Sequence, residues 1–415
     1  MSKIVLTKAD TLQGCVKING AKNAALPILA ATLLANEPCV IKSIPPLADI
    51  ENMCEILKHA GYQVRRRNTT LSIQPKPLKN LKFPYELTNK LRASFLIAGP
   101  LLAKYKHLEI SYPGGCAIGA RPVDLHLKGF EALGAIISKQ NGYIEIFTDK
   151  LTGNKIYLDF PSVGATENLI MAACLAEGQT VIENAAIEPE ITDLANFLNS
   201  MGAEISGAGT DTIKISGVKD LSGADHRVIP DRIEAGTYMV AAAACHGHVT
   251  VSNVICEHLK PIIAKLRESG IEVIENYNSV TVNAAERFKP IDLKTLPYPG
   301  FPTDMQAQFS SYLSGIPGTS IVTETIFENR FMHLGELKRM GANIKTEGRT
   351  AVIEGAALTG AKVKATDLRA GAALVIAGLH ADGETEISDC QYITRGYYQF
   401  YENLNQLGAN IVRID

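Results

Sequence analysis

A sixfold internal repeat constrains the fold of this 415-residue chain more than any other feature of its sequence. In each copy an amphipathic stretch ends at a glycine and an alternating strand follows, at intervals of 67 to 73 residues. Glycine suits a helix end because it enters the left-handed conformation without steric cost. The six glycines are Gly61, Gly134, Gly202, Gly270, Gly341 and Gly408.

A second element recurs with the same period, namely a polar opening followed by an Ala-rich apolar helix and a strand. TDMQA at 303–307 and TDLRA at 366–370 are two nearly identical openings. Because an all-apolar helix must be enclosed, the pattern predicts an α/β fold of two similar domains with three repeats each. The buried helices would lie inside and the strands outside. The openings are Lys22-Asn23-Ala24, Leu91-Arg92-Ala93, Thr166-Glu167-Asn168, Ile233-Glu234-Ala235, Met305-Gln306-Ala307 and Leu368-Arg369-Ala370.

Composition excludes several classes of protein. Lys and Arg number 41 against 43 Asp and Glu, so a nucleic-acid binder that neutralises phosphates is excluded, and 46% hydrophobic residues exclude a disordered chain. Eight cysteines without a C-x-x-C pair indicate neither a zinc site nor a disulfide framework, and they favour reduced thiols in a cytoplasmic protein. The apolar run from Ala24 to Ala35 is too short to span a membrane, so we expect a buried helix and a soluble protein. His246 and His248 have no third ligand near them in sequence, so no metal site is expected.

The segment around Cys116 differs from its counterparts in the other repeats. Pro113 and three glycines leave it with little side-chain bulk, which suits a loop that closes over a ligand. Arg121 lies five residues on and would favour the reactive thiolate. The alternative is that Cys116 is a small buried hydrophobic residue. GGCAIGARP is not a Walker A loop, because the Gly-Lys-Ser/Thr sequence is missing.

Cations beside helix starts and glycine turns indicate an anionic substrate. Lys22 begins the first buried helix, where free amide groups favour a phosphate, although a surface lysine is the alternative. Asp304 lies between a Pro-containing turn and a buried helix, and there we favour a capping role over that of a general base. Arginine grips carboxylate and phosphate with two parallel bonds, but each of these arginines could also be a surface ion-pair partner. They are Arg92, Arg121, Arg330, Arg369 and Arg395.

Nine segments of the chain, in order and over its whole length, carry a family resemblance. The segments are GAKNAALPILAA (20–31), KLRAS (90–94), PGGCAIGARPVDLH (113–126), SVGATEN (162–168), PDRIEAGT (230–237), FPTDMQAQ (301–308), TETIFENRFMH (323–333), TDLRAG (366–371) and RGY (395–397). Together they resemble the UDP-N-acetylglucosamine 1-carboxyvinyltransferase family.

The resemblance implies two inverse, barrel-like α/β domains with the active site in the cleft between them. The first domain would cover 22–229, and the second would combine 1–21 with 230–415. The implied reaction moves the enolpyruvyl group of phosphoenolpyruvate to the 3′-hydroxyl of UDP-N-acetylglucosamine and releases phosphate, the first committed step of peptidoglycan precursor synthesis. The two small molecules are the expected partners. No cofactor is implied, and no nucleic acid or membrane is expected to bind.

The resemblance also assigns roles to single residues. Cys116 would be the general acid, able to form a covalent adduct with phosphoenolpyruvate, and Asp304 would be the base or orienting group for the sugar hydroxyl. Lys22, Arg121 and Arg395 would hold the phosphate, with Lys22 and Arg395 also counted as catalytic. Arg330 and Arg369 would hold the carboxylate, and Asn23 would contact both substrates. The other expected contacts of the sugar nucleotide are Arg92, Arg121, Pro122, Val123, Asp124, Leu125, Ser162, Val163, Gly164, Asp304 and Ile326.

One position departs from the family pattern. Phe160 stands where some members have a basic residue near the uracil, and Phe can stack on the base but cannot donate a hydrogen bond. Three alternatives compete with the transferase: a silent paralogue that binds UDP-N-acetylglucosamine, the shikimate-pathway carboxyvinyltransferase, and a repeat scaffold for protein partners. Retention of Lys22, Cys116, Asp304 and Arg395 favours an active enzyme, which we expect to be a monomer.

Overall fold

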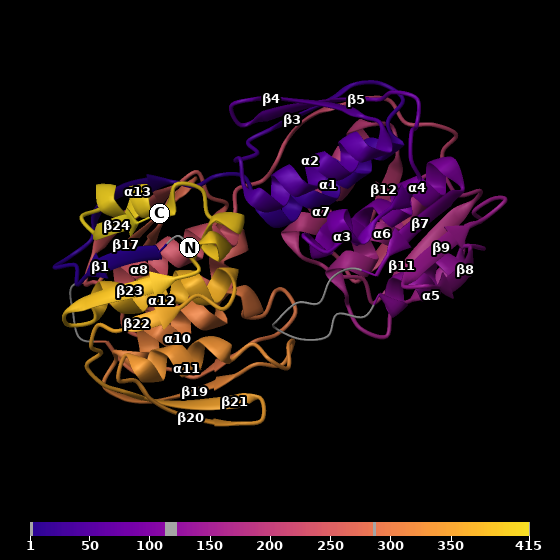
Figure 1. Ribbon diagram of the computed structural model, residues 1–415. Helices are drawn as coiled ribbons and strands as arrows, with labels where there is room; N and C mark the ends of the chain where they lie inside the picture. Colours follow the sequence, from indigo (N-terminus) through magenta and orange to yellow (C-terminus); the bar gives the residue numbers. More distant parts are fainter. Residues whose placement is uncertain (1–2, 113–122, 285–287, 415) are drawn as a thin grey trace. The chain divides into compact units, whose positions relative to one another are not determined.

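The computed structural model describes residues 3–112, 123–284 and 288–414 (Figure 1). Within these residues the chain separates into two compact units. The middle unit holds residues 20–112 and 123–229, and the terminal unit holds residues 3–19, 230–284 and 288–414. The described chain passes from one unit to the other at 19–20 and at 229–230.

A four-stranded sheet of one pattern recurs six times in the described residues. The first strand pairs in parallel with the second, the second pairs antiparallel with the third, and the third pairs antiparallel with the fourth. The sheets of the middle unit are β14 (Asp225–Arg227), β3 (Cys39–Lys42), β5 (Thr70–Gln74), β4 (Gln63–Arg67); β6 (Lys82–Phe83), β7 (His107–Ser111), β9 (Tyr143–Phe147), β8 (Ile136–Gln140); and β10 (Lys155–Tyr157), β11 (Gln179–Glu183), β13 (Thr212–Ser216), β12 (Glu204–Ser206).

The terminal unit repeats the pattern with strands from both ends of the chain. Its sheets are β2 (Gln13–Lys17), β15 (His248–Ser252), β17 (Ser279–Asn283), β16 (Glu272–Glu275); β18 (Leu293–Lys294), β19 (Gly318–Thr323), β21 (Thr350–Gly355), β20 (Asn343–Glu347); and β22 (Lys362–Lys364), β23 (Glu384–Ser388), β1 (Lys3–Thr7), β24 (Asn410–Ile414). The sixfold repeat predicted from the glycine spacing and the predicted α/β class are therefore confirmed.

Three strands reach their sheets from distant parts of the chain. β1 pairs with both β23 and β24, with Lys3 opposite Ser388 and Ile414, so the two ends of the chain meet in one sheet. β2 pairs in parallel with β15, which follows it only after the whole middle unit, and β14 pairs in parallel with β3 from the opposite end of the middle unit's sequence. The regular interval of glycines carries no sign of this exchange.

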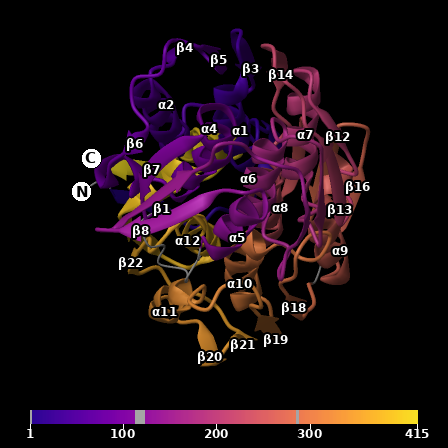
Figure 2. The ribbon, with the colours of Figure 1, turned by 90° about the vertical axis from the view of Figure 1, so that its right-hand side faces the viewer.

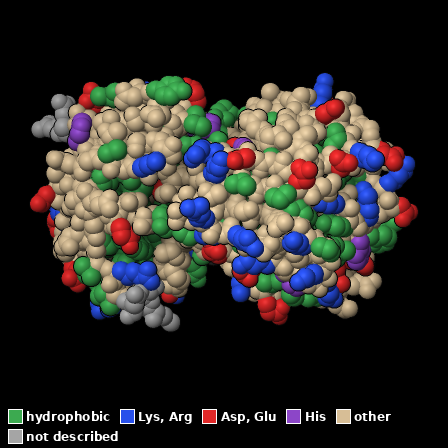
Figure 3. Space-filling view, turned by 90° about the horizontal axis from the view of Figure 1, so that it is seen from above, with side chains coloured by type: hydrophobic (Ala, Val, Ile, Leu, Met, Phe, Trp, Pro, Cys, Tyr) green, Lys and Arg blue, Asp and Glu red, His purple; other side chains and the backbone are tan. Residues whose placement is uncertain are grey.

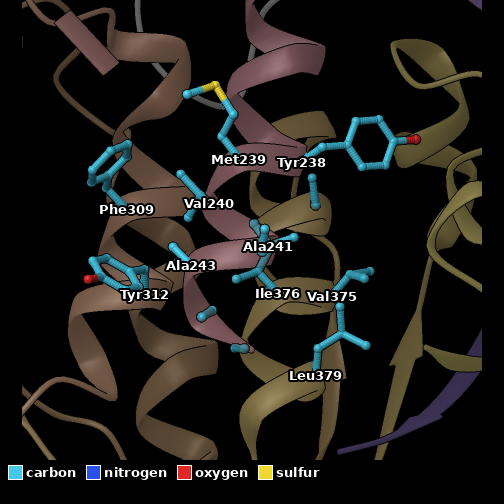
Figure 4. Packing of buried hydrophobic residues seen from close by; sticks show 14 of the residues in the cluster. Tyr238, Met239, Val240, Ala241, Ala243, Phe309, Tyr312, Val375, Ile376 and Leu379 are labelled. Atoms are coloured by element: carbon cyan, nitrogen blue, oxygen red, sulfur yellow. The ribbon is translucent and has the colours of Figure 1, made fainter. Parts of the chain in front are cut away.

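The apolar helices are enclosed, as the pattern predicts. In the terminal unit α8, α10 and α12 contact one another, and Figure 4 shows Met239, Phe309 and Ile376 from these helices in one core. In the middle unit α6 contacts α4, α5 and α7 (Figures 1 and 2). Burying these side chains contributes roughly 25 cal/mol per Å² of apolar area removed from water. The enclosed helices are α1 (Lys22–Ala31), α4 (Ala98–Tyr105), α6 (Val163–Ala173), α8 (Arg232–Ala244), α10 (Gln306–Ser314) and α12 (Leu368–His380).

The beginnings of these helices differ in part from the polar openings read in the sequence. α1 begins at Lys22 and α12 at Leu368, as expected, but α6 begins at Val163, so Thr166-Glu167-Asn168 lies inside the helix. The reason is Ser162, whose side chain accepts a hydrogen bond from the Ala165 amide and caps the helix earlier. Short 3₁₀ turns precede α4 and α10. They are η2 (Arg92–Ile97) and η4 (Thr303–Met305).

The second helix of each repeat ends where the sequence predicts. All six repeat glycines have φ between 90° and 113°, the left-handed region that ends a helix. These amphipathic helices are α2 (Ala48–Ala60), α5 (Asp124–Ala132), α7 (Pro189–Ser200), α9 (Lys260–Glu268), α11 (Met332–Arg339) and α13 (Phe400–Gln406). The remaining helical segments are α3 (Tyr85–Thr88), η1 (Thr32–Leu34), η3 (Cys256–Leu259) and η5 (Cys390–Arg395).

The surface and the cysteines fit the composition. On the face shown in Figure 3, Lys and Arg side chains intersperse with Asp and Glu, in line with a net charge of −2. The seven cysteines in the described ranges are free thiols. No helix in the described part of the chain is long and apolar enough to cross a membrane. The same residues hold no group of three His, Cys, Asp or Glu side chains that could bind a metal.

Candidate active site

Two buried arginines converge on Asp304 in the terminal unit. Arg330 Nη2 lies 2.7 Å from Asp304 Oδ1, and Arg369 Nη2 lies 2.9 Å from Asp304 Oδ2. Arg330 is 5% exposed and Arg369 is 4% exposed, whereas the Asp304 side chain is 25% exposed. The two guanidiniums are thus enclosed around a carboxylate that solvent still reaches.

The charge of this cluster is fixed by the arginines. Burial alone would raise the pKa of Asp304, but the guanidiniums of Arg330 and Arg369 outweigh burial and hold that pKa well below its usual range. Asp304 is therefore ionised at neutral pH. A carboxylate whose pKa is depressed is a weak base, so this arrangement favours orienting a hydroxyl over removing its proton outright, and the two enclosed cations can bind a further anion.

One expectation and one alternative from the sequence are wrong here. Asp304 was expected to cap a helix, but its turn has no side-chain cap, because both carboxylate oxygens are bonded to arginines. Arg330 and Arg369 are not surface ion-pair partners, since both are buried. The two residues lie 26 and 65 positions beyond Asp304, which is why local sequence could not reveal the pairing.

The side chains of Arg369 and Arg330 are positioned by a helix start and by hydrogen bonds to a turn. Arg369 is the second residue of α12. Asp367 caps the first amides of this helix, and Asp367 Oδ1 accepts from the Arg369 amide at 2.8 Å. Arg330 precedes α11 and donates from Nη1 to Thr303 Oγ1 at 2.9 Å. Thr303 adjoins Asp304 in η4, so the same turn carries both contacts of Arg330.

Glu324 stabilises this turn through a hydrogen bond to Thr303, and the sequence analysis assigned it no role. It is 1% exposed, and its Oε2 accepts from Thr303 Oγ1 at 2.8 Å. Its Oε1 accepts from the amides of Ile326 and Phe327 at 2.8 and 3.1 Å and from Thr295 Oγ1 at 2.9 Å. A glutamate flanked by threonines before a turn is the signal that could have identified it, since such turns leave amides to be satisfied.

We expect Glu324→Gln to lower the free energy of unfolding by about 1–3 kcal/mol, because the amide nitrogen would face donors that need an acceptor. Turnover should fall as well, since Thr303 and Arg330 lose their support. Urea denaturation and initial rates measure both effects. Glu347→Gln on the exposed face of β20 is the matched control, and equal behaviour of the two variants would contradict the role of Glu324.

The guanidinium of Arg369 also lies over an aromatic ring. Its guanidinium carbon lies 5.3 Å from the centroid of the Tyr397 ring, a cation–π arrangement. The Tyr397 hydroxyl lies 2.9 Å from Thr237 Oγ1 and accepts from Gln308 Nε2 at 3.3 Å. Arg395 stands two residues before Tyr397, at the end of η5, and is half-buried.

In the middle unit Lys22 is buried rather than at the surface. It is 8% exposed at the first position of α1, and its Nζ lies 3.0 Å from Oδ2 of Asp49 in α2. Asn23 follows it and is exposed. Lys22 thus places an ammonium at the first position of α1, where the positive end of the helix dipole also favours an anion.

Most of the residues expected to contact the sugar nucleotide cluster at helix starts in the middle unit. Asp124 and Leu125 open α5, Ser162 caps α6, and Arg92 opens η2. α6 contacts both α5 and η2, so the three starts belong to neighbouring elements. Val123, Val163 and Gly164 lie in the same turns.

The remaining expected contacts divide between the two units and the chain outside the described residues. Phe160 is 45% exposed, and its carbonyl accepts from the Ser162 amide at 2.7 Å. Ile326 lies in the terminal unit, where its amide is bound to Glu324. Cys116, Arg121 and Pro122 lie outside the described residues, so their expected roles stay predictions.

Comparison with known proteins shows the family of the chain. Residues 6–404 match the family described as EPSP synthase (3-phosphoshikimate 1-carboxyvinyltransferase). UDP-N-acetylglucosamine 1-carboxyvinyltransferase 1 of Caldanaerobacter subterraneus subsp. tengcongensis is 59% identical over 413 residues, covering 99% of each chain. UDP-N-acetylglucosamine 1-carboxyvinyltransferase 2 of Carboxydothermus hydrogenoformans is 59% identical over 417 residues, covering 100% of each.

Solved structures share the fold at much lower identity. The enolpyruvyl transferase NikO from Streptomyces tendae superposes with a TM-score of 0.90 at 22% identity, over 99% of this chain and 98% of its own. EPSP synthase from Acinetobacter baumannii gives 0.80 at 17%, over 100% of both chains. Full-length identity of 59% to the first group against 17% to the last distinguishes the two kinds of transferase. The chain therefore belongs to the UDP-N-acetylglucosamine 1-carboxyvinyltransferase family, within the wider fold of enolpyruvyl transferases.

Proposed function

We propose that the Asp304 and Lys22 clusters serve the reaction of this family. In it the enolpyruvyl group of phosphoenolpyruvate passes to the 3′-hydroxyl of UDP-N-acetylglucosamine with release of phosphate, at the start of peptidoglycan precursor synthesis. The observation that carries the proposal is the ionised Asp304 between two enclosed guanidiniums. Phosphoenolpyruvate is an anion with a carboxylate and a phosphate, so it needs cations of this kind.

The chemistry sets three tasks for the protein. The sugar oxygen bonds to C2 of the enolpyruvyl group, so the hydroxyl must lose a proton while the methylene carbon gains one. Phosphate then leaves C2 and the methyl carbon gives up a proton, which restores the double bond. Throughout, the carboxylate and the phosphate must stay neutralised by cations.

We assign the base or orienting role to Asp304, because it is ionised and partly open to solvent. Arg330 and Arg369 bind the carboxylate of phosphoenolpyruvate, supported by their burial and convergence. Lys22, with Arg121 and Arg395, binds the phosphate, and Cys116 is the acid that protonates the methylene carbon. The assignments of Cys116 and Arg121 rest on the family pattern of their segment.

The sugar nucleotide is assigned to the helix starts of the middle unit, with Asp304 and Ile326 contributing from the terminal unit. The cap at Ser162 and the starts of η2 and α5 supply amides and a cation for a diphosphate. Asn23 and Arg121 contact both substrates. We assign Phe160 to stacking on the uracil, supported by its exposure of 45%.

We also propose that the protein acts as a cytoplasmic monomer on these two small molecules and needs no cofactor. The seven free cysteines in the described ranges support the location, because reduced thiols persist in the cytoplasm. Gel filtration at micromolar concentration tests the oligomeric state, and elution at twice the mass of 44.7 kDa would contradict a monomer.

The reaction is tested by phosphate release from phosphoenolpyruvate with UDP-N-acetylglucosamine and shikimate 3-phosphate offered separately. We expect release with the first acceptor only. Release with shikimate 3-phosphate alone would favour the shikimate-pathway enzyme. Release with neither, from folded protein shown by mass spectrometry to carry no adduct, would favour a silent protein that binds the nucleotide.

A further inference from the structure

A fully buried asparagine lies in helix α6. Asn168 is 0% exposed. Its Oδ1 accepts from the Gly99 amide at 2.8 Å, and its Nδ2 donates to the Phe95 carbonyl at 3.0 Å and to His126 Nδ1 at 2.8 Å. Both N–H groups and the oxygen of the amide are therefore in use. Burying a side-chain amide is costly unless its hydrogen bonds are satisfied. We therefore attribute the presence of Asn168 to the hydrogen bonds that link it to neighbouring elements and not to its packing.

The hydrogen bonds of Asn168 allow only one placement of the hydrogen atoms on its amide and on the His126 ring. The Gly99 amide can only donate and the Phe95 carbonyl can only accept, which fixes the orientation of the Asn168 side chain. Its second N–H must then point at His126 Nδ1, so that nitrogen accepts. The ring of His126 is neutral and carries its proton on Nε2. Burial, with a smaller effect of Arg92, lowers the pKa of His126 to about 3, in agreement with a neutral ring.

The imidazole ring is held on further sides. The Phe95 ring meets it edge-on, with centroids 5.2 Å apart and planes at 86°. A Cβ added at Gly164 would come within 3.3 Å of its Cε1 atom, so the start of α6 already lies against the ring. The ring of His126 thus contacts η2 through Phe95 and lies close to the first turn of α6.

Two of the three partners of Asn168, Phe95 and His126, lie in elements assigned to the sugar nucleotide, whereas Gly99 lies in α4. Phe95 lies in η2, which Arg92 opens, and His126 lies in α5 directly after Leu125. Asn168 itself lies in α6, five residues after Val163. One side chain therefore connects all three helix starts.

We propose that Asn168, acting through His126, is a positioning residue that holds the three helix starts in the spacing the sugar nucleotide requires. The inference rests on the proposed function of those starts. Asn168 touches no substrate in this scheme. Its effect passes through the orientation of the His126 ring and the attachment of η2 to α6.

The test compares Asn168→Leu, which removes all three bonds, with Asn168→Asp, which keeps the acceptor for Gly99, loses the donor to Phe95 and can bond to His126 only if the ring moves its proton to Nδ1. We expect the KM for UDP-N-acetylglucosamine to rise roughly 10- to 100-fold in both, since displacements of about 1 Å at a binding site cost that much. The KM for phosphoenolpyruvate should stay near that of the wild type. Direct calorimetric binding of UDP-N-acetylglucosamine should weaken by a similar factor.

An exposed asparagine in the same unit, with two comparable bonds to backbone, controls for the loss of such bonds away from the helix starts. Asn199 in α7 also clamps backbone, with Nδ2 donating to the Ile205 carbonyl at 3.0 Å and Oδ1 accepting from the Ile205 amide at 2.9 Å. Asn199→Leu should lower stability and leave both KM values unchanged. At position 126, Asn can place an oxygen where Nδ1 stood, so His126→Asn should retain more nucleotide affinity than His126→Leu.

The ring state provides a readout that does not depend on turnover or on the folding of an Asn168 variant. In wild-type protein labelled with ¹⁵N-histidine, His126 should show the neutral form protonated on Nε2. A proton on Nδ1, an equal rise of both KM values, or the same selective rise in Asn199→Leu would each overturn the inference. Wild-type protein without turnover of UDP-N-acetylglucosamine would instead contradict the proposed function.

Discussion

Asp304→Asn is expected to lower kcat by roughly 100- to 10,000-fold, the range that a positioned base contributes. The replacement keeps the shape of the side chain but removes the charge that orients or deprotonates the sugar hydroxyl. It also leaves the guanidiniums of Arg330 and Arg369, 5% and 4% exposed, beside each other without their carboxylate. Initial rates of phosphate release at saturating substrates measure the loss.

The same variant should be less stable by roughly 3–5 kcal/mol at pH 7, the cost of removing one partner from a buried ionic cluster. The folded pKa of Asp304 is depressed, so its stabilising effect is complete above the unfolded value of 3.8 and is lost as pH falls toward the folded pKa. The stability difference between wild type and Asp304→Asn should therefore be constant near neutrality and shrink below about pH 4. Denaturant titrations across this range measure it.

A charge removed elsewhere in the same unit provides the control. Asp382 pairs with Lys8 at 2.6 Å, but both side chains are more than half exposed, so Asp382→Asn should change neither rate nor stability appreciably. Loss of stability in Asp304→Asn with turnover retained would assign Asp304 a structural role only. Turnover and stability both equal to those of Asp382→Asn would remove it from the site altogether.

The local part of the fold could be predicted from the sequence. The six repeat glycines were expected at helix ends and all have φ between 90° and 113°, because the preference for glycine there depends on its own backbone. The apolar helices were expected inside, and the core formed by α8, α10 and α12 confirms this. Both features follow from residues within one repeat.

Features that join distant residues could not be read in this way. The pairing of β1 with β23 and β24 brings together residues at least 377 positions apart, from Thr7 opposite Glu384 upward, and no local pattern encodes it. At the site, Asp304 seemed a helix cap because its sequence neighbours fit one, whereas its true partners lie 26 and 65 residues on. Asn168 was missed as a support for the same reason, since its partners Phe95 and His126 lie 73 and 42 residues away, whereas Glu324 had a local signal in its flanking threonines that was not used.

Cys116→Ser is expected to reduce turnover by roughly 100- to 10,000-fold while leaving the fold unchanged. Protonation of the methylene carbon needs an acid that gives up its proton near neutral pH. A cysteine thiol, with an ordinary pKa near 8.5, can do so, whereas a serine hydroxyl is a far weaker acid. Sulfur is also the stronger nucleophile, so the adduct with phosphoenolpyruvate should disappear together with turnover.

The two consequences of Cys116→Ser can be measured on the same samples. Intact-protein mass spectrometry after incubation with phosphoenolpyruvate should detect an adduct on wild type and none on Cys116→Ser, and phosphate release should fall in parallel. Cys15→Ser makes the same replacement at an exposed thiol in β2, so it should retain both the adduct and the rate. If Cys116→Ser kept full turnover without forming an adduct, the covalent species would not be needed for catalysis. Another group near the substrates would then have to be the acid.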